Sequence, residues 1–304
     1  MTKLPPLPEN LSRQAGFLTA HEQQKLWEAA LLMSESRGLL VRLVTVFGRQ
    51  VEGVRSAISG VGGRLAGDSW TKLEKKLQDS LEEILWRSYS YATFGLESAP
   101  SFLRPRQPRK NRLHQAATTV SGVASGFVGL PGVLIDLPFT TATILRSIAE
   151  IARDYGEDLS SDETRRTCLE VLTFGGPGEA GAQTEAGYWA ARLGMSHMTT
   201  GLLIRSAAGQ LSLVLSEKIL VQTVPVAGAV ACGLLNYNFT DYYQSMAKVH
   251  FCLRALERRT GDPEGVARCF NAMLEAARDR RKLGGRARRR VLPALLTGAS
   301  PPAT

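Results

Sequence analysis

Two long runs without a charged side chain constrain the fold of this chain more than any other feature. The first, residues 116–135, reads AATTVSGVASGFVGLPGVLI, and the second, residues 219–237, reads ILVQTVPVAGAVACGLLNY. In the first run, Gly122, Gly126 and Gly129 have the small-residue spacing that lets helix backbones approach closely. Segments of this composition must be enclosed by other protein elements or reach lipid, because exposed apolar surface is unfavourable in water.

Elsewhere the apolar residues recur at helical spacing, and no segment alternates as a strand would. There is also no internal repeat and no heptad run. The sequence therefore predicts an all-α protein, a multi-helix bundle with Gly-rich apolar helical hairpins. The predicted helices cover approximately residues 19–47, 68–88, 138–155, 160–174, 179–194, 196–216, 225–259 and 264–281.

Local signals set several of the expected helix ends. Thr19 and Glu22 have the spacing of a capping box, as do Ser160 and Glu163. Gly156 is suited to the left-handed position that ends a helix.

The proline and glycine content divides the chain into a central domain and two tails. We expect a flexible N-terminal tail over residues 1–17, an all-helical domain over 18–283 and a basic, disordered tail over 284–304. Within the domain, residues 99–114 hold several prolines and basic residues and are expected to form an extended, exposed linker. The N-terminal residues lack the apolar core of a signal peptide, so we expect a cytoplasmic protein.

Leu130, Pro131 and Gly132 are expected to break the first uncharged run, and a new helix is expected to begin near Pro138 with Asp136 close to its N-cap. Three interpretations of the run remain open. It forms a buried hairpin inside a soluble core, or it lies on or inserts into a membrane, or it spans the membrane. It has about the 20 residues that a spanning helix needs, but Thr, Ser and Gly make it weakly hydrophobic.

The net charge of +9 favours a polyanionic partner. One basic cluster immediately precedes the first uncharged run and another closes the chain, so an anionic membrane surface is the expected partner. The alternative is a solvated surface that keeps the protein soluble. No aromatic residues are interleaved with the basic ones, and we expect no nucleic-acid binding. The clusters are Arg104, Arg106, Arg109, Lys110 and Arg112, and Arg278, Arg280, Arg281, Lys282, Arg286, Arg288, Arg289 and Arg290.

Searches for catalytic signatures give no complete motif: HExxH, GxSxG, GxxxxGK[ST] and GxGxxG are all absent from the sequence. The four histidines are scattered, and His250 is expected to pack inside a helix interface. The four cysteines form no CxxC pair and are interpreted as buried, reduced thiols. We therefore expect no catalytic residues, no cofactor and no metal site.

Charges beside the uncharged runs need partners if they are buried. Arg146 and Glu150 are four residues apart and are expected to pair on one helix face. We further predict that Asp136 or Glu150 pairs with Arg205, which is the one charge between Met195 and Ser216. The alternative is that Asp136 serves as a helix cap.

Several segments together resemble the EcsC family over approximately residues 20–280. They are GLPGVLIDLPFTT at 129–141, LRSIAEIARDYGED at 145–158, CLEVL at 168–172, VPVAGA at 224–229, NYNFTD at 236–241 and HFCLRALE at 250–257. The motif positions matched are Pro131, Gly132, Asp136, Pro138, Arg146, Glu150, Tyr155, Gly156, Pro225, Gly228, Asn236, Phe251 and Arg254. With Arg205, these are the candidate functional residues.

The family is mostly bacterial, is named for a protein encoded beside an ABC transporter and is described as membrane-associated. The resemblance therefore implies a non-catalytic accessory protein at the inner face of the cell membrane, with a possible membrane-protein partner. The peptidase label sometimes given to the family finds no motif here. The alternative function is a soluble cytosolic helical module with a ligand or protein site near Asp136, Arg146 and Asn236.

Overall fold

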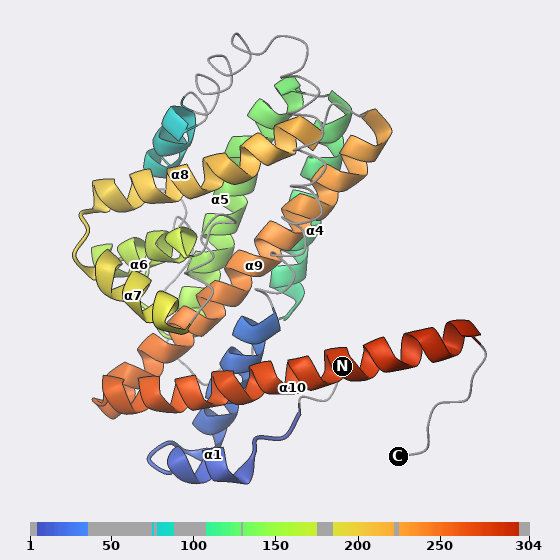
Figure 1. Ribbon diagram of the computed structural model, residues 1–304. Coiled ribbons are helices and arrows are strands. Elements are labelled where there is room, and N and C mark those ends of the chain that lie inside the picture. Colours follow the sequence, from blue (N-terminus) through green and yellow to red (C-terminus); the bar gives the residue numbers. More distant parts are fainter. Residues whose placement is uncertain are drawn as a thin grey trace. The chain divides into compact units, whose positions relative to one another are not determined.

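The computed structural model describes residues 5–35, 75, 78–87, 108–128, 130–174, 185–221 and 225–297. For residues 108–111, 125–128, 130–137, 185–187, 210, 213–221, 225–232, 235 and 283–297 it describes the backbone alone. All secondary structure in these ranges is helical (Figure 1), which confirms the predicted all-α class.

The helices follow the predicted order closely. They are α1 (Glu9–Gln14), α4 (Pro108–Val128), α5 (Leu130–Asp154), α6 (Asp162–Thr173), α7 (Glu185–Ser196), α8 (Thr200–Val221), α9 (Pro225–Thr260) and α10 (Pro263–Thr297), together with helical residues 20–35 and 78–87. Among the described residues, no helix combines the length and the hydropathy needed to cross a bilayer.

The chain divides into two compact units. Unit 1 contains Met1–Glu35 and Cys252–Thr304, and unit 2 contains Ser36–Phe251. The division falls within α9, so most of that helix belongs to unit 2 and its last turns belong to unit 1.

Unit 1 contains an ordered segment where the sequence predicted a flexible tail. Residues 9–14 form α1, and Leu11 and Ala15 are buried. The indole Nε1 of the fully buried Trp27 donates a hydrogen bond to the carbonyl of Pro5 at 2.8 Å. The prediction for residues 5–17 was wrong because these few apolar side chains find core positions despite the high proline content of the segment.

The predicted capping box of Thr19 and Glu22 is confirmed in unit 1. Glu22 Oε2 accepts hydrogen bonds from the Thr19 backbone N–H at 2.9 Å and from its hydroxyl at 2.8 Å. Glu22 is buried and also forms an ion pair with Arg259. The carboxylate therefore both caps the helix of residues 20–35 and connects it to the end of α9.

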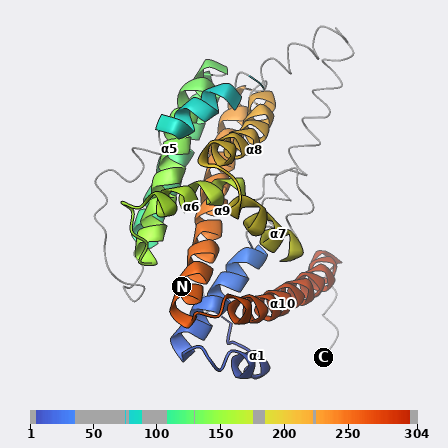
Figure 2. The same ribbon diagram turned by 90° about the vertical axis from the view of Figure 1, so that its left-hand side faces the viewer.

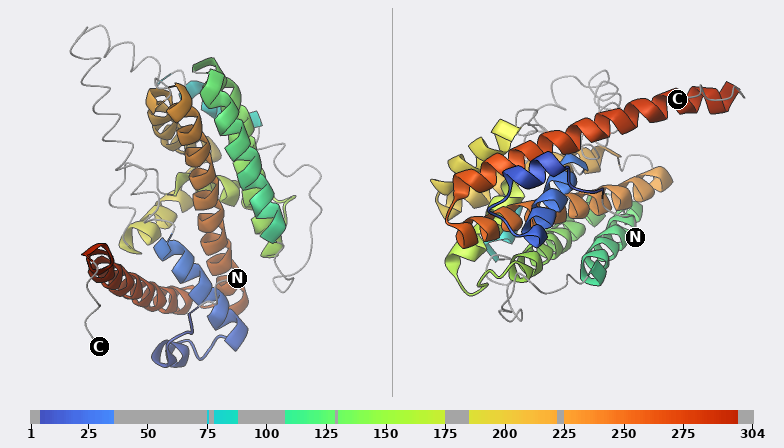
Figure 3. Two further views of the ribbon diagram at one scale, coloured as in Figure 1. Left: turned by 90° about the vertical axis from the view of Figure 1, so that its right-hand side faces the viewer. Right: turned by 90° about the horizontal axis from the view of Figure 1, so that it is seen from below.

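Unit 2 is built around the hairpin formed by α4 and α5, which pack side by side (Figure 3). Helix α6 packs against α5 and against α8 (Figure 2). The hairpin turns where the sequence predicted a break, since α4 ends at Val128 and α5 begins at Leu130, with Pro131 in its first turn. The second uncharged run is likewise interrupted before Pro225, which is the first residue of α9.

Two predicted helix starts and the predicted end of the linker were wrong. Helix α5 begins at Leu130, so Pro138 lies inside it and Asp136 is not its N-cap. Pro138 is exposed, and the packing of the hairpin compensates for the hydrogen bond that an interior proline removes. Helix α4 already begins at Pro108, so the expected linker extends no further than residue 107. Proline is favoured at the first position of a helix because its missing N–H is not needed there.

The third error concerns α6, which Ser161 caps in place of Ser160. The Ser161 hydroxyl accepts a hydrogen bond from the Thr164 N–H at 3.1 Å, whereas Ser160 bonds to Asp158. At the other end of the chain, α10 continues to Thr297, beyond its predicted end near Arg281. The Ala, Leu and Arg residues that follow have high helix propensity, although this part of α10 also contains Gly284, Gly285 and Pro293.

The predicted helix stop at Gly156 is confirmed by its backbone conformation, and Gly261 ends α9 in the same way. Gly156 has a φ of 80° and Gly261 has a φ of 66°. L-residues other than glycine rarely adopt this left-handed region, which ends helices by satisfying their last carbonyl groups. The Gly156 and Glu157 N–H groups bond back to Arg153 and Ala152, and the Gly261 N–H bonds to Glu257.

Candidate functional site

Hydrogen bonds connect α4, α5 and α9 at one level, which we call the polar layer. The hydroxyl groups of Thr118 on α4 and Thr240 on α9 lie 2.8 Å apart. Asn236 on α9 donates to the Thr118 carbonyl at 2.8 Å and to the Thr140 hydroxyl on α5 at 3.3 Å. Thr118, Thr240 and Asn236 are buried, so these bonds satisfy polar groups that have no access to water.

A second set of contacts connects α4 to α9 one turn further along. Gln115 Nε2 donates to Asp241 Oδ1 at 2.9 Å and to Gln244 Oε1 at 3.1 Å. Burial raises the pKa of the Asp241 carboxyl above its ordinary value, while the charge of Lys248 and the Gln115 hydrogen bond act in the opposite direction. The ionised form of Asp241 is therefore disfavoured by its surroundings.

This pKa direction predicts the effect of Asp241→Asn on stability. A carboxyl whose folded pKa is raised stabilises the fold at low pH, and that contribution is lost as the pH rises through the folded pKa. We expect Asp241→Asn to be more stable than the native protein at pH 7, with the gain disappearing as Asp241 becomes protonated in acid. Urea unfolding at a series of pH values measures this, and a pH-independent difference would contradict it.

The predicted pair of Arg146 and Glu150 is confirmed, and the structure adds His114 to it. Arg146 Nε lies 3.7 Å from Glu150 Oε1, and His114 Nε2 lies 3.2 Å from Glu150 Oε2. Glu150 is buried, whereas Arg146 is partly exposed. Through His114, Glu150 thus connects α5 to α4.

Arg205 does not pair with Glu150. Its guanidinium lies 3.6 Å from Glu82, and its side chain is 71% exposed. The prediction was wrong because it assumed a buried arginine, whereas Arg205 lies on the outer face of α8. The alternative partner, Asp136, has a side chain outside the described residues.

The outer faces of the same three helices are apolar. On α4, Leu113 and Val120 are 67% and 69% exposed, and Ala116 and Ala124 are exposed between and beyond them. The exposed large side chains on the neighbouring helices are Phe139 on α5 and Leu234 and Tyr237 on α9. Polarity is therefore inverted on α4, whose hydrogen-bonding Thr118 is buried while its exposed side chains beyond Arg112 are apolar; α5 and α9 bury apolar side chains such as Ile144 and Phe239 as well.

Helices α4 and α9 approach each other closely at Gly233. A Cβ atom at this position would lie 2.5 Å from Val123 Cγ2 and 3.3 Å from the Thr119 carbonyl oxygen. Only a residue without a side chain allows this spacing, which resembles the small-residue contacts between helices in membranes.

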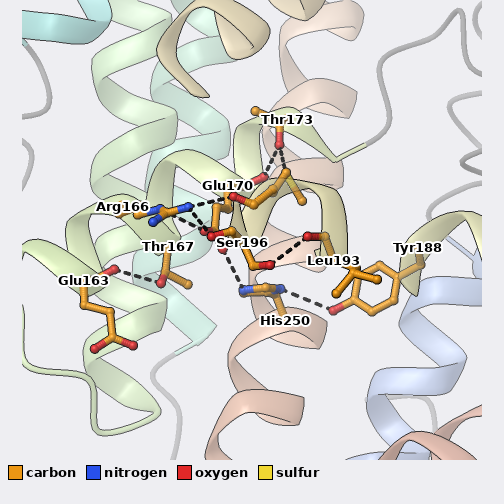
Figure 4. Close-up of polar contacts among 10 residues, drawn as sticks. Glu163, Arg166, Thr167, Glu170, Thr173, Tyr188, Leu193, Ser196 and His250 are labelled. Atoms are coloured by element: carbon orange, nitrogen blue, oxygen red, sulfur yellow. Dashed lines mark hydrogen bonds and ion pairs between the residues drawn. The ribbon is translucent and has the colours of Figure 1, made fainter. Parts of the chain in front are cut away.

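A separate buried cluster connects α6, α7 and α9 (Figure 4). Tyr188 Oη lies 3.3 Å from His250 Nδ1, and Glu170 Oε2 lies 3.9 Å from His250 Nε2. Arg166 pairs with Glu170 at 3.4 Å and donates to the Met195 and Ser196 carbonyls at 2.7 and 3.1 Å.

This cluster explains the expected burial of His250, which is 2% exposed. Arg166 caps the end of α7, where a cation is favoured by the helix dipole. The sequence analysis did not identify Tyr188, Glu170 or Arg166. Glu170 lies within segment 168–172, one of the segments that resemble the EcsC family, and this position was the one sequence signal that pointed to the cluster. In the described part of the chain, no group of three His, Cys, Asp or Glu side chains could hold a metal ion.

The remaining candidate residues are dispersed. Pro131, Gly132 and Asp136 lie on α5, and Pro225 and Gly228 lie on α9, all without described side chains. Tyr155 is buried at the end of α5. Arg254 lies on the part of α9 that belongs to unit 1.

The basic residues predicted to contact lipid also separate into groups. Arg109 and Lys110 lie in the first turn of α4, and Arg112 is exposed one turn later. Arg104 and Arg106 fall outside the described residues. Arg286, Arg288, Arg289 and Arg290 lie on α10, whose side chains are not described there. Cys168, Cys252 and Cys269 form no disulfide and are buried as predicted, and the side chain of Cys232 is not described.

Comparison with known proteins gives one match. The EcsC protein family matches residues 46–256, which covers most of the chain and includes the polar layer and the His250 cluster. No curated protein and no solved structure matches the chain.

Proposed function

The chain belongs to the EcsC protein family, and on that premise we propose that it is a non-catalytic, peripheral membrane protein that binds an anionic bilayer through α4, α5 and α9. Its position at the inner face of the cell membrane, as an accessory to a transporter, is part of the same proposal. The alternative is a soluble helical module that binds a ligand or protein near Asp136, Arg146 and Asn236.

The inverted polarity of α4 carries the proposal. A helix on the surface of a soluble protein buries its apolar face and exposes polar residues. In α4 the buried positions are Thr118 and Gly122, and beyond Arg112 the exposed positions Leu113, Ala116, Val120 and Ala124 are all apolar. This arrangement suits lipid as the outer medium, because the outward side chains gain apolar surroundings there.

The charge distribution along α4 supports an anionic surface. All its charged residues, Arg109, Lys110 and Arg112, are cations within the first five positions, and it contains no acidic residue. A basic residue near an anionic leaflet contributes about 1 kcal/mol. Apolar contact together with this attraction gives reversible binding, in the way that interfacial helices bind.

The contacts of the candidate residues favour this function over the ligand-binding alternative. Arg146 pairs with Glu150, and Asn236 bonds to Thr118 and Thr140. The first contact lies within α5 and the others connect α9 to α4 and α5, and both kinds use hydrogen-bonding groups that a ligand would need.

Vesicle flotation with paired variants tests the proposal. We expect Leu113→Ser/Val120→Ser to bind vesicles of phosphatidylcholine and phosphatidylglycerol about 30-fold more weakly than the native protein, because each apolar side chain contributes roughly 1 kcal/mol on partial burial. Leu193→Ser/Leu202→Ser is the matched control, since these leucines are similarly exposed on α7 and α8.

Equal losses in the two double variants would contradict the role of α4, as would native protein that does not float with the vesicles. Urea unfolding of each variant shows whether the fold is retained. Because all four residues are exposed, we expect the unfolding midpoints to remain within the narrow range typical of surface substitutions.

A further inference from the structure

The hydrogen bonds of the polar layer fix how α4, α5 and α9 are aligned. Asn236 contacts both Thr118 and Thr140, and further along α9 Asp241 contacts Gln115 on α4. Residue numbers thus rise along α9 as they fall along α4, so the two helices are antiparallel. The end of α4 at Val128 therefore lies at the same end of unit 2 as the starts of α5 and α9.

At this end all three helices have long segments that are almost free of charge. The segments are residues 113–128 of α4, 130–145 of α5 and 225–240 of α9, which together we call the uncharged end. Asp136 is the one acidic residue in these three sequences, and they contain no Lys or Arg.

The first charged residues beyond the uncharged end lie at a common level. Arg112 is six residues before Thr118, Arg146 is six residues after Thr140, and Asp241 is five residues after Asn236. Because Asn236 is hydrogen-bonded to both Thr118 and Thr140, nearly equal spacing from these residues places the charges at nearly equal height. We call Arg112, Arg146 and Asp241 the charged collar.

The exposed apolar side chains belong to all three helices and lie on the uncharged side of this collar. Val120, Phe139 and Leu234 are each within two residues of the polar layer on their own helix. Three helices in mutual contact face outward in different directions. We call these three exposed apolar residues the belt; a helix lying flat on a membrane needs only a single apolar face.

The dimensions match one leaflet of a bilayer. From Leu113 to Val128, α4 rises about 24 Å at 1.5 Å per residue. Half of a bilayer, including its head groups, is about 20–22 Å thick. If the tip of the uncharged end, at Val128 of α4, lay at the bilayer centre, the charged collar would therefore lie at the boundary between head groups and water.

We propose that the uncharged end inserts end-on into a single anionic leaflet, down to the charged collar. This inference rests on the proposed function and specifies its geometry. Arg112 and Arg146 lie among the lipid phosphates, the belt contacts the upper part of the acyl chains, and the turn between α4 and α5 is the deepest point. Arg109 and Lys110 in the first turn of α4 add cations on the water side of the collar.

The contacts inside the uncharged end suit a low-dielectric medium. Hydroxyl and amide hydrogen bonds between helices persist in lipid, where the alternative is an unsatisfied polar group. The close approach at Gly233 depends on van der Waals contact, which does not need water. The three helices can thus enter lipid without rearranging their interface.

Charged residues near the tip restrict the insertion to one leaflet. Asp136 lies four residues from Thr140 on the tip side. Helix α8 ends at Val221, four residues before Pro225 begins α9, and its last two turns include Glu217 and Lys218. Charges at the centre of a bilayer cost several kcal/mol, so these residues oppose movement of the tip past the centre into the second leaflet.

Nitroxide depth measurements test the orientation. Single cysteines are introduced at Leu113, Val120 and Ala124 of the full chain, in a Cys232→Ala background whose other cysteines are buried. After spin labelling, oxygen and nickel-chelate accessibility on phosphatidylcholine–phosphatidylglycerol vesicles give the depth of each label. Leu193→Cys on α7 is the control. The Cys232→Ala protein without an introduced cysteine, taken through the same labelling reaction, shows whether the native thiols stay unreactive.

End-on insertion predicts increasing depth along α4. The label at 120 should lie about 10 Å deeper than that at 113, and the label at 124 about 16 Å deeper, at 1.5 Å per residue. Equal depths at the three positions would overturn this inference but leave membrane binding intact. Labels that remain as accessible to water as the Leu193→Cys control would overturn both the inference and the proposed function.

Discussion

Replacing Gly233 with valine should destabilise the protein by about 3 kcal/mol, the upper part of the range for overpacked cores. A Cβ atom here would lie 2.5 Å from Val123 Cγ2. Valine has a strongly preferred rotamer in a helix, so Val123 cannot rotate away at low cost. The backbone oxygen of Thr119, at 3.3 Å, prevents a shift in the other direction. Urea unfolding measures this loss, which should appear as a lower urea concentration at the unfolding midpoint.

A rescue experiment separates this clash from a general effect of replacing glycine. Val123→Ala removes the clashing methyl group, so Gly233→Ala should destabilise less in that background than in the native one. Gly209→Ala is the matched control, because no atom lies within 4 Å of a Cβ at this helical position. There, alanine should stabilise by up to about 1 kcal/mol through helix propensity. A Gly233→Val protein as stable as the native one would contradict the close approach of α4 and α9.

The second large effect is expected for Tyr188→Ala, which should lower stability by about 3–5 kcal/mol, as is typical for large aromatic residues in cores. Tyr188 is 1% exposed, and its ring stacks on Phe174 with centroids 5.0 Å apart. Its hydroxyl oxygen lies within hydrogen-bonding distance of His250 Nδ1, at 3.3 Å. The substitution therefore leaves a cavity and removes a partner of a buried imidazole.

Tyr188→Phe distinguishes the two contributions. It retains the ring and removes the hydroxyl, so it should destabilise by about 1 kcal/mol, the usual net value of one hydrogen bond. Denaturant unfolding of both variants measures the difference. If phenylalanine proved as damaging as alanine, the cluster would depend on the hydroxyl contact with His250 more than on aromatic packing.

The sequence predicted the helical architecture well because its signals were local. Gly156 and Gly261 required a left-handed backbone, and the Thr19–Glu22 spacing matched a capping box. The pairing of Arg146 with Glu150 followed from their separation of four residues on one helix. Each of these features is determined within one or two helical turns.

The candidate site depended on contacts that sequence spacing does not reveal. Thr118, Thr140 and Asn236 come from three helices and meet because of the way these helices pack. Arg205 was expected to be buried, but the outward orientation of its helix face exposes it. Pro138 was taken as a helix start, whereas the packing of the hairpin allows the helix to continue through it. In each case tertiary contacts outweighed the local signal.

The account depends on lipid being the medium outside α4, and cell fractionation tests this most directly. Membranes from cells that make the native protein are collected, then washed first with concentrated salt and then with alkaline carbonate. Because apolar contact supplements charge attraction, we predict that the protein sediments with the membranes and resists the salt wash. Recovery in the soluble fraction before any wash would contradict the account.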